Sequence, residues 1–226
     1  MGHMKKIVLI FILSLLAISC TLTNEQRAEL LIEEIIKENL YHPDSYEPIK
    51  THVDSMFIDS STIGPMIEIQ EELKDLLVKV KSCENKIESA ESSMDIWAPD
   101  VFSTKYSRGQ YERAQKDKIE AEKNLSKINK KVQEYIAELK DNVEKFHKNE
   151  FTGWIVFHRY RGLNGAGTMT IPSDMVFFFD IDFQSCHGYE YEKFEKIIEL
   201  IQIVEDTDSC DDDILDYIEE NKYSIF

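Results

Sequence analysis

Two long stretches of the 226-residue sequence repeat apolar residues at alternating spacings of four and three, over residues 69–94 and 121–146. Such a heptad repeat places the apolar side chains along one face of a helix, in a seam that pairs with a second helix. A short break around Pro99 separates the two stretches. The spacing therefore predicts an antiparallel coiled-coil hairpin over residues 65–148.

The charges of the two stretches favour pairing within one chain. Residues 66–96 carry four basic and eight acidic side chains, whereas residues 107–148 carry eleven basic and eight acidic ones. If the seams meet, the numbers of opposed residues add to about 208, which places Ile69 near Leu139. Two alternatives stay open: the helices could lie apart, or the same heptads could pair between two chains. The oligomeric state is therefore undetermined.

The N-terminus predicts export and lipidation. Lys5 and Lys6 precede about a dozen apolar residues that end at Cys20, a run too short to span a bilayer. The segment resembles a bacterial lipoprotein signal, with Ala17 where leucine is usual. We therefore expect residues 1–19 to be a signal peptide and Cys20 to be the lipidated residue; the alternative is a secretory signal without lipidation. The mature chain would touch the membrane through its lipid alone.

The amino-acid composition limits the kinds of partner and of cross-link that we expect for this protein. Lys and Arg total 26 against 43 Asp and Glu, a formal charge of -17, which argues against nucleic acid because phosphate binding needs a basic face. Four cysteines are too few for a disulfide scaffold. Cys186 and Cys210 flank one predicted helix, however, and a disulfide between them is a candidate in an oxidising periplasm.

The rest of the chain alternates between helix and strand patterns. Helices are predicted at 23–40 and 191–204 and after the acidic run 205–213, and strands at 46–59, 151–161 and 168–182. The fold class is therefore α+β: a small antiparallel sheet packed on helices, formed by residues 20–64 and 149–226, with the hairpin inserted between them. In the strand 151–161, alternation puts Trp154 and His158 on one face and Arg159 and Arg161 on the other.

Two segments carry a resemblance to a known family. Residues 40–49 contain Pro43, Ser45, Tyr46 and Glu47, and residues 151–167 contain Gly153, Trp154, His158, Tyr160, Arg161, Asn164 and Gly167. Together they resemble small uncharacterised lipoproteins of Bacteroidetes with a P-x-S-Y-E segment and a G-W-x-x-x-H-x-Y-R-x-x-N-x-x-G strand and turn. Leu163 departs from the lysine usual there. The resemblance implies a small sheet packed on a helix and a lipid anchor, and no activity.

The sequence offers two candidate binding sites. His158, Arg159, Arg161 and Asn164 would line a polar site at a sheet edge, although fold roles alone would also explain them. Aromatic residues crowd the expected tip of the hairpin and would bind a partner protein, or else fold back to close the end of the coil. These tip residues are Trp97, Phe102, Tyr106 and Tyr111.

Motifs for catalysis, cofactors or metals are missing from the sequence. It has no nucleophile elbow, no phosphate-binding glycine loop and no H-E-x-x-H. An EF-hand alignment of the run at 205–213 lacks the required glycine and final glutamate. We therefore expect a non-enzymatic protein without cofactor or metal, lipid-anchored in the outer membrane and facing the periplasm, that acts as an adaptor or scaffold through its hairpin. The alternative is a ligand-binding or inhibitor module that uses the sheet face around His158 and Arg161.

Overall fold

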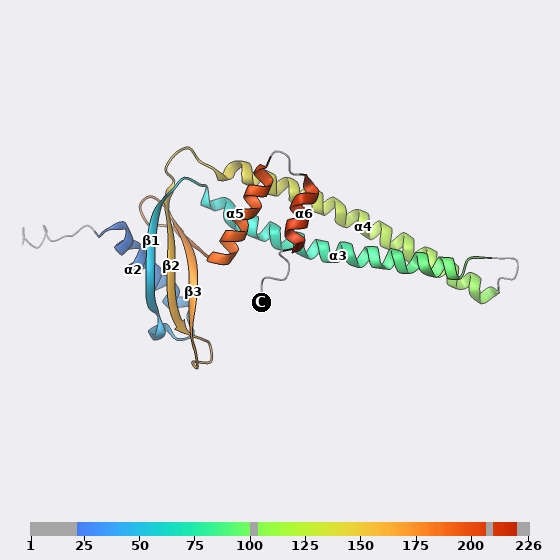
Figure 1. Cartoon of the computed structure of the whole chain (residues 1–226), viewed down its shortest axis with the longest axis horizontal. Coiled ribbons are helices and arrows are strands. Elements are labelled where there is room, and N and C mark those ends of the chain that lie inside the picture. The colour runs from blue at the N-terminus through green and yellow to red at the C-terminus, as the bar shows by residue number, and fades with distance from the viewer. Residues whose placement is uncertain (1–21, 100–103, 207–209, 221–226) are drawn as a thin grey trace, which may run out of the picture. The chain divides into compact units, whose positions relative to one another are not determined.

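The computed structural model describes residues 22–99, 104–206 and 210–220 (Figure 1). In this part of the chain the helices are α2 (Asn24–Asn39), α3 (Ile63–Ile96), α4 (Lys105–Phe146), α5 (Tyr191–Glu205) and α6 (Asp211–Glu220). The strands are β1 (Glu47–Met56), β2 (Gly153–Leu163), β3 (Thr170–Phe179) and β4 (Cys186–Glu190). These elements confirm the predicted α+β class. The signal peptide predicted at residues 1–19, Cys20 and Phe102 lie outside the described residues.

The described residues form two compact units. The sheet unit consists of residues 22–56 and 151–192, and the hairpin unit consists of residues 57–150 and 193–220. The sequence prediction instead assigned everything from residue 149 onward to the sheet. The division observed therefore differs from the predicted one in its C-terminal helical segment.

The C-terminal helices join the hairpin unit through their own contacts. Helix α6 packs on α3, and the Lys140 ammonium of α4 lies 2.6 Å from a carboxylate oxygen of Asp211 in α6. The fully buried side chains of α5 and α6 include Ile197, Leu200, Ile214 and Ile218. Because helical periodicity shows that a face is apolar but not what covers it, the sequence could not assign these helices to either unit.

The sheet has the order β1-β2-β3-β4, and every neighbouring pair is antiparallel. Strand β4 was not expected from the sequence. It has only five residues and contains Gly188, which lies against the ring of Phe177: a Cβ atom at Gly188 would come within 2.7 Å of that ring. Because β4 pairs with β3, β3 is an interior strand of the sheet.

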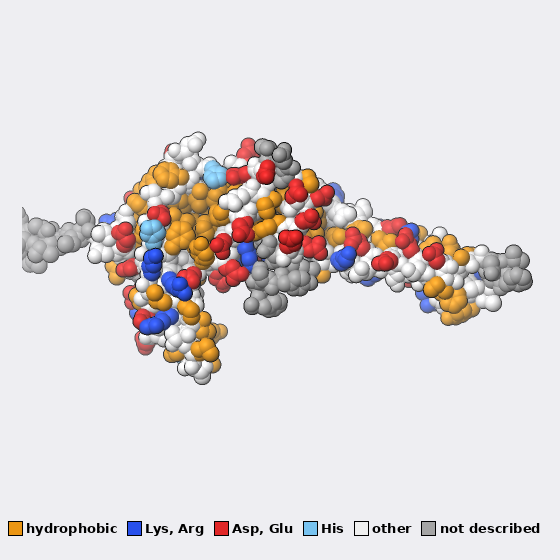
Figure 2. Space-filling view, viewed as in Figure 1, with side chains coloured by type: hydrophobic (Ala, Val, Ile, Leu, Met, Phe, Trp, Pro, Cys, Tyr) orange, Lys and Arg blue, Asp and Glu red, His pale blue; other side chains and the backbone are white. Residues whose placement is uncertain are grey.

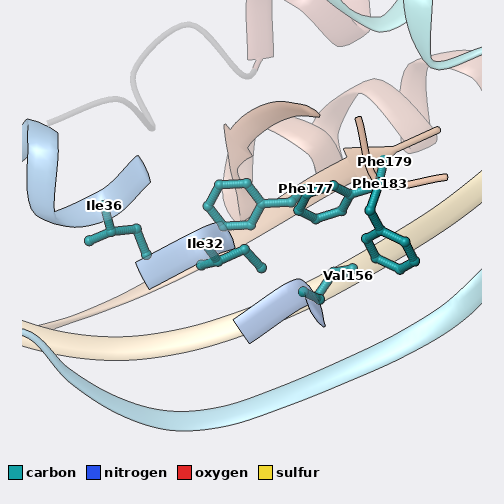
Figure 3. Packing of buried hydrophobic residues seen from close by; sticks show 7 residues of the cluster. Ile32, Ile36, Val156, Phe177, Phe179 and Phe183 are labelled. Atoms are coloured by element: carbon teal, nitrogen blue, oxygen red, sulfur yellow. The ribbon is translucent and has the colours of Figure 1, made fainter. Parts of the chain in front are cut away.

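Helix α2 covers one face of the sheet. Its N-terminus is a capping box, in which Thr23 and Gln26 bond each other's backbone amides. Its buried face meets inward side chains of β2 and β3 and of the loop after β3 (Figure 3). The residues of this core are Ala28, Ile32, Ile36, Val156, Phe177, Phe179 and Phe183. Because side chains alternate along a strand, their neighbours lie on the opposite face, which we call the far face.

In the hairpin unit, α3 and α4 pack against each other along most of the predicted seam. Near the base of α4, however, the buried residues are Ile136 and Val143 and not their neighbours Tyr135 and Asn142, which the heptad spacing predicted. Buried seam residues include Ile69, Leu73, Leu76, Cys83 and Ala90 in α3 and Ala114, Ala121, Val132 and Leu139 in α4. Lys118 of α4 donates to a Glu91 carboxylate oxygen of α3 at 2.6 Å. These residue numbers add to 209, one away from the predicted register. Among the described residues, no helix combines the length and apolar character needed to cross a membrane.

Candidate functional site

The structure separates the polar residues that the sequence grouped at a sheet edge. Strand β2 lies in the interior of the sheet, between β1 and β3. His158 is 2% exposed and faces α2, where it exchanges hydrogen bonds with the Tyr46 hydroxyl at 3.0 Å and the Thr51 hydroxyl at 3.1 Å. His158 therefore lies inside the sheet and not at its edge, and both of its imidazole nitrogens are satisfied within the sheet unit; a binding role for it stays a prediction.

The environment of His158 favours the neutral imidazole. Burial lowers the pKa of His158, and the nearby carboxylate of Glu29 opposes that shift. Burial, aided by Glu33 and Glu29, raises the pKa of Tyr46 to about 12, so its hydroxyl keeps its proton. The imidazole also stacks on the Tyr160 ring, with 5.9 Å between ring centroids. This buried polar network orders the core of the sheet unit.

Arg161 lies on the far face and is occupied by an ion pair. Its Nε donates to Glu47 Oε2 at 2.8 Å and its Nη2 to Glu47 Oε1 at 2.5 Å, so β1 and β2 are joined by a two-point contact. The hydrogen bond from Arg161 lowers the pKa of Glu47. Asn164 lies in the β2–β3 turn, where its side-chain oxygen accepts from the Thr168 amide at 2.9 Å. Both residues therefore have roles within the fold.

Arg159 belongs instead to a shallow depression on the far face, which we call the sheet depression. Its volume is about 370 Å³. The residues that line it include Lys50 and His52 of β1, Phe157 and Arg159 of β2, Asp174 of β3, and Tyr191 at the start of α5. Figure 2 shows Lys, Arg and His side chains gathered beside hydrophobic ones over these strands. The lining also includes Met175 and His158, which is 2% exposed, so the sequence singled out Arg159 and His158 of this set.

The seam of the hairpin changes in side-chain size along its length. Near the base it contains large, fully buried side chains such as Met66, Leu73, Ile136 and Leu139. Farther along, towards the connection between α3 and α4, the buried positions hold small residues, namely Cys83, Ala90, Ala114 and Ala121. On one side of these small residues the helices enclose a groove of about 920 Å³, which we call the hairpin groove.

The rims of the hairpin groove are polar. Ser82, Lys86 and Ser89 of α3 face Arg113, Asp117, Glu120 and Asn124 of α4, and Trp97 lies at the end nearest the tip. The heptad spacing of the sequence did not predict the groove. The recurrence of small seam residues at a spacing of seven, at Cys83 and Ala90 and again at Ala114 and Ala121, was the signal that could have indicated it.

The structure brings two of the predicted tip aromatics together. The rings of Trp97 and Tyr106 meet edge to face with centroids 5.8 Å apart, and Tyr106 remains 65% exposed. Tyr111 is half-buried one turn farther along α4. The tip therefore combines an internal aromatic contact with an exposed ring, so it supports parts of both sequence interpretations.

The cysteines described by the structure are free thiols, so the disulfide considered between Cys186 and Cys210 is absent. Cys186 is half-buried on β4 and packs against the core beneath α2, where burial raises the pKa of its thiol to about 12. Cys210 is exposed beside α6 in the hairpin unit. Within the described ranges, no three His, Cys, Asp or Glu side chains are grouped to hold a metal ion.

These features define a class by architecture: a four-stranded antiparallel sheet unit combined with a long helical hairpin that carries an open groove. No family model, curated protein or solved structure matches the chain. The resemblance of residues 40–49 and 151–167 to Bacteroidetes lipoproteins therefore stays a prediction from motifs.

Proposed function

We propose that this protein is a non-enzymatic, lipid-anchored component of the cell envelope whose helical hairpin binds another envelope protein, as an adaptor or scaffold. The anchor at Cys20 and the periplasmic face of the outer membrane are inferred from the N-terminal sequence. The observation that carries the binding role is the hairpin groove, because it is an open concave surface of about 920 Å³ between two helices.

The size change along the seam supports a binding role. Large side chains at Leu73 and Leu139 close the base, so that end of the hairpin needs no partner for its packing. The small side chains of Ala90 and Ala121 form part of the groove floor, and the side chains of a third helix would pack against the groove between the two rims. A partner helix lying along the groove would thus complete a three-helix bundle over the distal half of the hairpin.

The length of the hairpin and the charge of its distal part also favour binding to a partner protein. The 42 residues of α4 extend about 60 Å at 1.5 Å per residue. The distal part of the hairpin, residues 79–99 and 104–131, carries twelve basic and eight acidic side chains, a net charge of +4 in a chain of -17. Acidic groups on a partner would be attracted to this part and repelled by the rest of the chain.

Site-specific photocrosslinking in cells that produce the full chain tests the proposal. A photoreactive residue in place of Ser89, on the groove rim, should capture one discrete envelope protein. The same residue in place of Ser126, which is exposed on α4 outside the groove lining, is the matched control and should capture none. Equal capture from both positions would refute a role for the groove.

Two further variants separate the parts of the proposal. Ser82→Trp places a large ring on the groove rim without touching the buried seam, so it should abolish the Ser89 crosslink. Persistence of that crosslink would place the partner elsewhere on the hairpin. Cys20→Ser should move the protein from the membrane fraction to the soluble fraction, and retention in the membrane would contradict lipid anchoring.

A further inference from the structure

The sheet depression has features of a small-molecule site that are independent of the hairpin. Its volume of about 370 Å³ falls within the usual range of ligand pockets, and it combines apolar rings with a few polar groups. All of its lining residues belong to the sheet unit. The arrangement of its charges and rings indicates which chemistry it would take.

Two cations line the depression, and only one carboxylate lies with them. Lys50 makes no ion pair with any of the residues that the structure describes, and it lies opposite Arg159 in the β1–β2 register. Arg159 has a single long contact, 3.6 Å from its Nε to Asp174 Oδ1. Arg161, by contrast, is held at two points by Glu47. Lys50 and Arg159 therefore retain donors for an anion, whereas Arg161 does not.

The apolar part of the depression comes from two aromatic rings. Phe157 of β2 and Tyr191 meet edge to face with centroids 6.1 Å apart, and Tyr191 is 39% exposed. An aromatic or aliphatic body resting against these rings would lose contact with water. Because Arg159 lies two residues beyond Phe157 on the same face of β2, one ligand could reach the rings and the cations together.

We propose that the sheet depression binds an organic anion in which a carboxylate is joined to an apolar, preferably aromatic, body. The carboxylate accepts hydrogen bonds from Lys50 and Arg159, and the body packs on Phe157 and Tyr191. Charge-assisted hydrogen bonds of this kind are stronger than neutral ones, so the carboxylate dominates recognition. An amine of the same shape meets two cations and is rejected.

Titration of the isotope-labelled full chain in detergent with 4-phenylbutyrate, followed by NMR amide shifts, tests the proposal. Saturable shifts should cluster on β1, β2 and the start of α5. 4-Phenylbutanol and 4-phenylbutylamine supply the same ring without the anion, and each should bind at least about tenfold more weakly. No saturable shift up to about 10 mM, or equal affinity for the amine, would overturn the proposal.

Substitutions of the charged side chains test which of them contact the carboxylate of the ligand. Lys50→Gln and Arg159→Gln should each weaken 4-phenylbutyrate binding about tenfold, while Arg161→Gln, on the same face but tied to Glu47, should change it less than about twofold. Lys50→Glu should reverse the preference towards 4-phenylbutylamine. These side chains are exposed, so the folded spectrum should be retained. Equal weakening by all three glutamine variants would show a general charge effect and refute the site.

Discussion

Replacing His158 by glutamine should flatten the dependence of the free energy of unfolding on pH below about pH 6.5. His158 is 2% exposed, and burial lowers its pKa from the usual value of 6.5. As the pH falls below about 6.5, the unfolded chain therefore gains a proton that the folded protein excludes. Stability is lost over this window, from the unfolded pKa down to the lower folded pKa.

The magnitude follows from linkage between proton binding and folding. One excluded proton changes the free energy of unfolding by at most about 1.4 kcal/mol for each pH unit within the window. Urea unfolding followed by circular dichroism at half-unit steps should show this slope in the wild-type protein. The slope should be smaller in His158→Gln, because groups that titrate elsewhere are common to both proteins and cancel in the difference.

Tyr46→Phe supplies the matched control. It removes the hydroxyl that bonds to His158 Nε2 but leaves the buried imidazole in place. The variant should lose about 1 kcal/mol of stability and keep the pH slope. Parallel curves for wild type and His158→Gln would refute the reasoning, since they would mean that the folded protein protonates His158 as readily as the unfolded chain does.

Three further substitutions have expected outcomes that thermal or urea unfolding can check. Gly153→Ala should destabilise the sheet unit by about 3 kcal/mol or more. The reason is that φ is 153° at this position and the new Cβ atom would lie 2.1 Å from a main-chain carbonyl oxygen. A loss of stability below about 1 kcal/mol would contradict this expectation. Leu73→Ala should cost about 2–5 kcal/mol, whereas Ile119→Ala, with its side chain 57% exposed, should cost less than about 0.5 kcal/mol, and similar losses would refute the seam. Arg161→Met should leave the urea midpoint almost unchanged, and any effect should shrink in high salt, because its pair with Glu47 is exposed; a large loss of stability that persists in high salt would contradict this.

The hairpin illustrates what local sequence can predict. Heptad spacing at Leu73 and Leu139 depends only on the helical repeat, so it predicted both long helices and the face that each one buries. Their register followed from matching the two seams, and the contact between Glu91 and Lys118 lies one residue from that expectation. The groove did not follow, because a void depends on which small side chains of two helices meet.

The sheet unit shows which features local sequence patterns could not predict. Alternation along β2 correctly placed His158 and Arg159 on opposite faces, yet it could not show that β2 lies in the interior of the sheet. The partners of His158 are 107 and 112 residues away in sequence, at Thr51 and Tyr46. No spacing rule connects such positions, so a buried network resembled an edge site.

The sequence by itself determined the helices, the strands β1 to β3, most of the two seams, the α2 cap and the faces of β2, because these depend on repeats of 3.6 and 2 residues and on short-range hydrogen bonds. Only the tertiary structure decided that β4 completes the sheet, that α5 and α6 group with the hairpin, and that Lys50 lies beside Arg159. Those outcomes depend on contacts between segments that are far apart in the sequence. Local propensity favours no one of the possible arrangements of these segments, and the burial of apolar side chains and the pairing of strands select one.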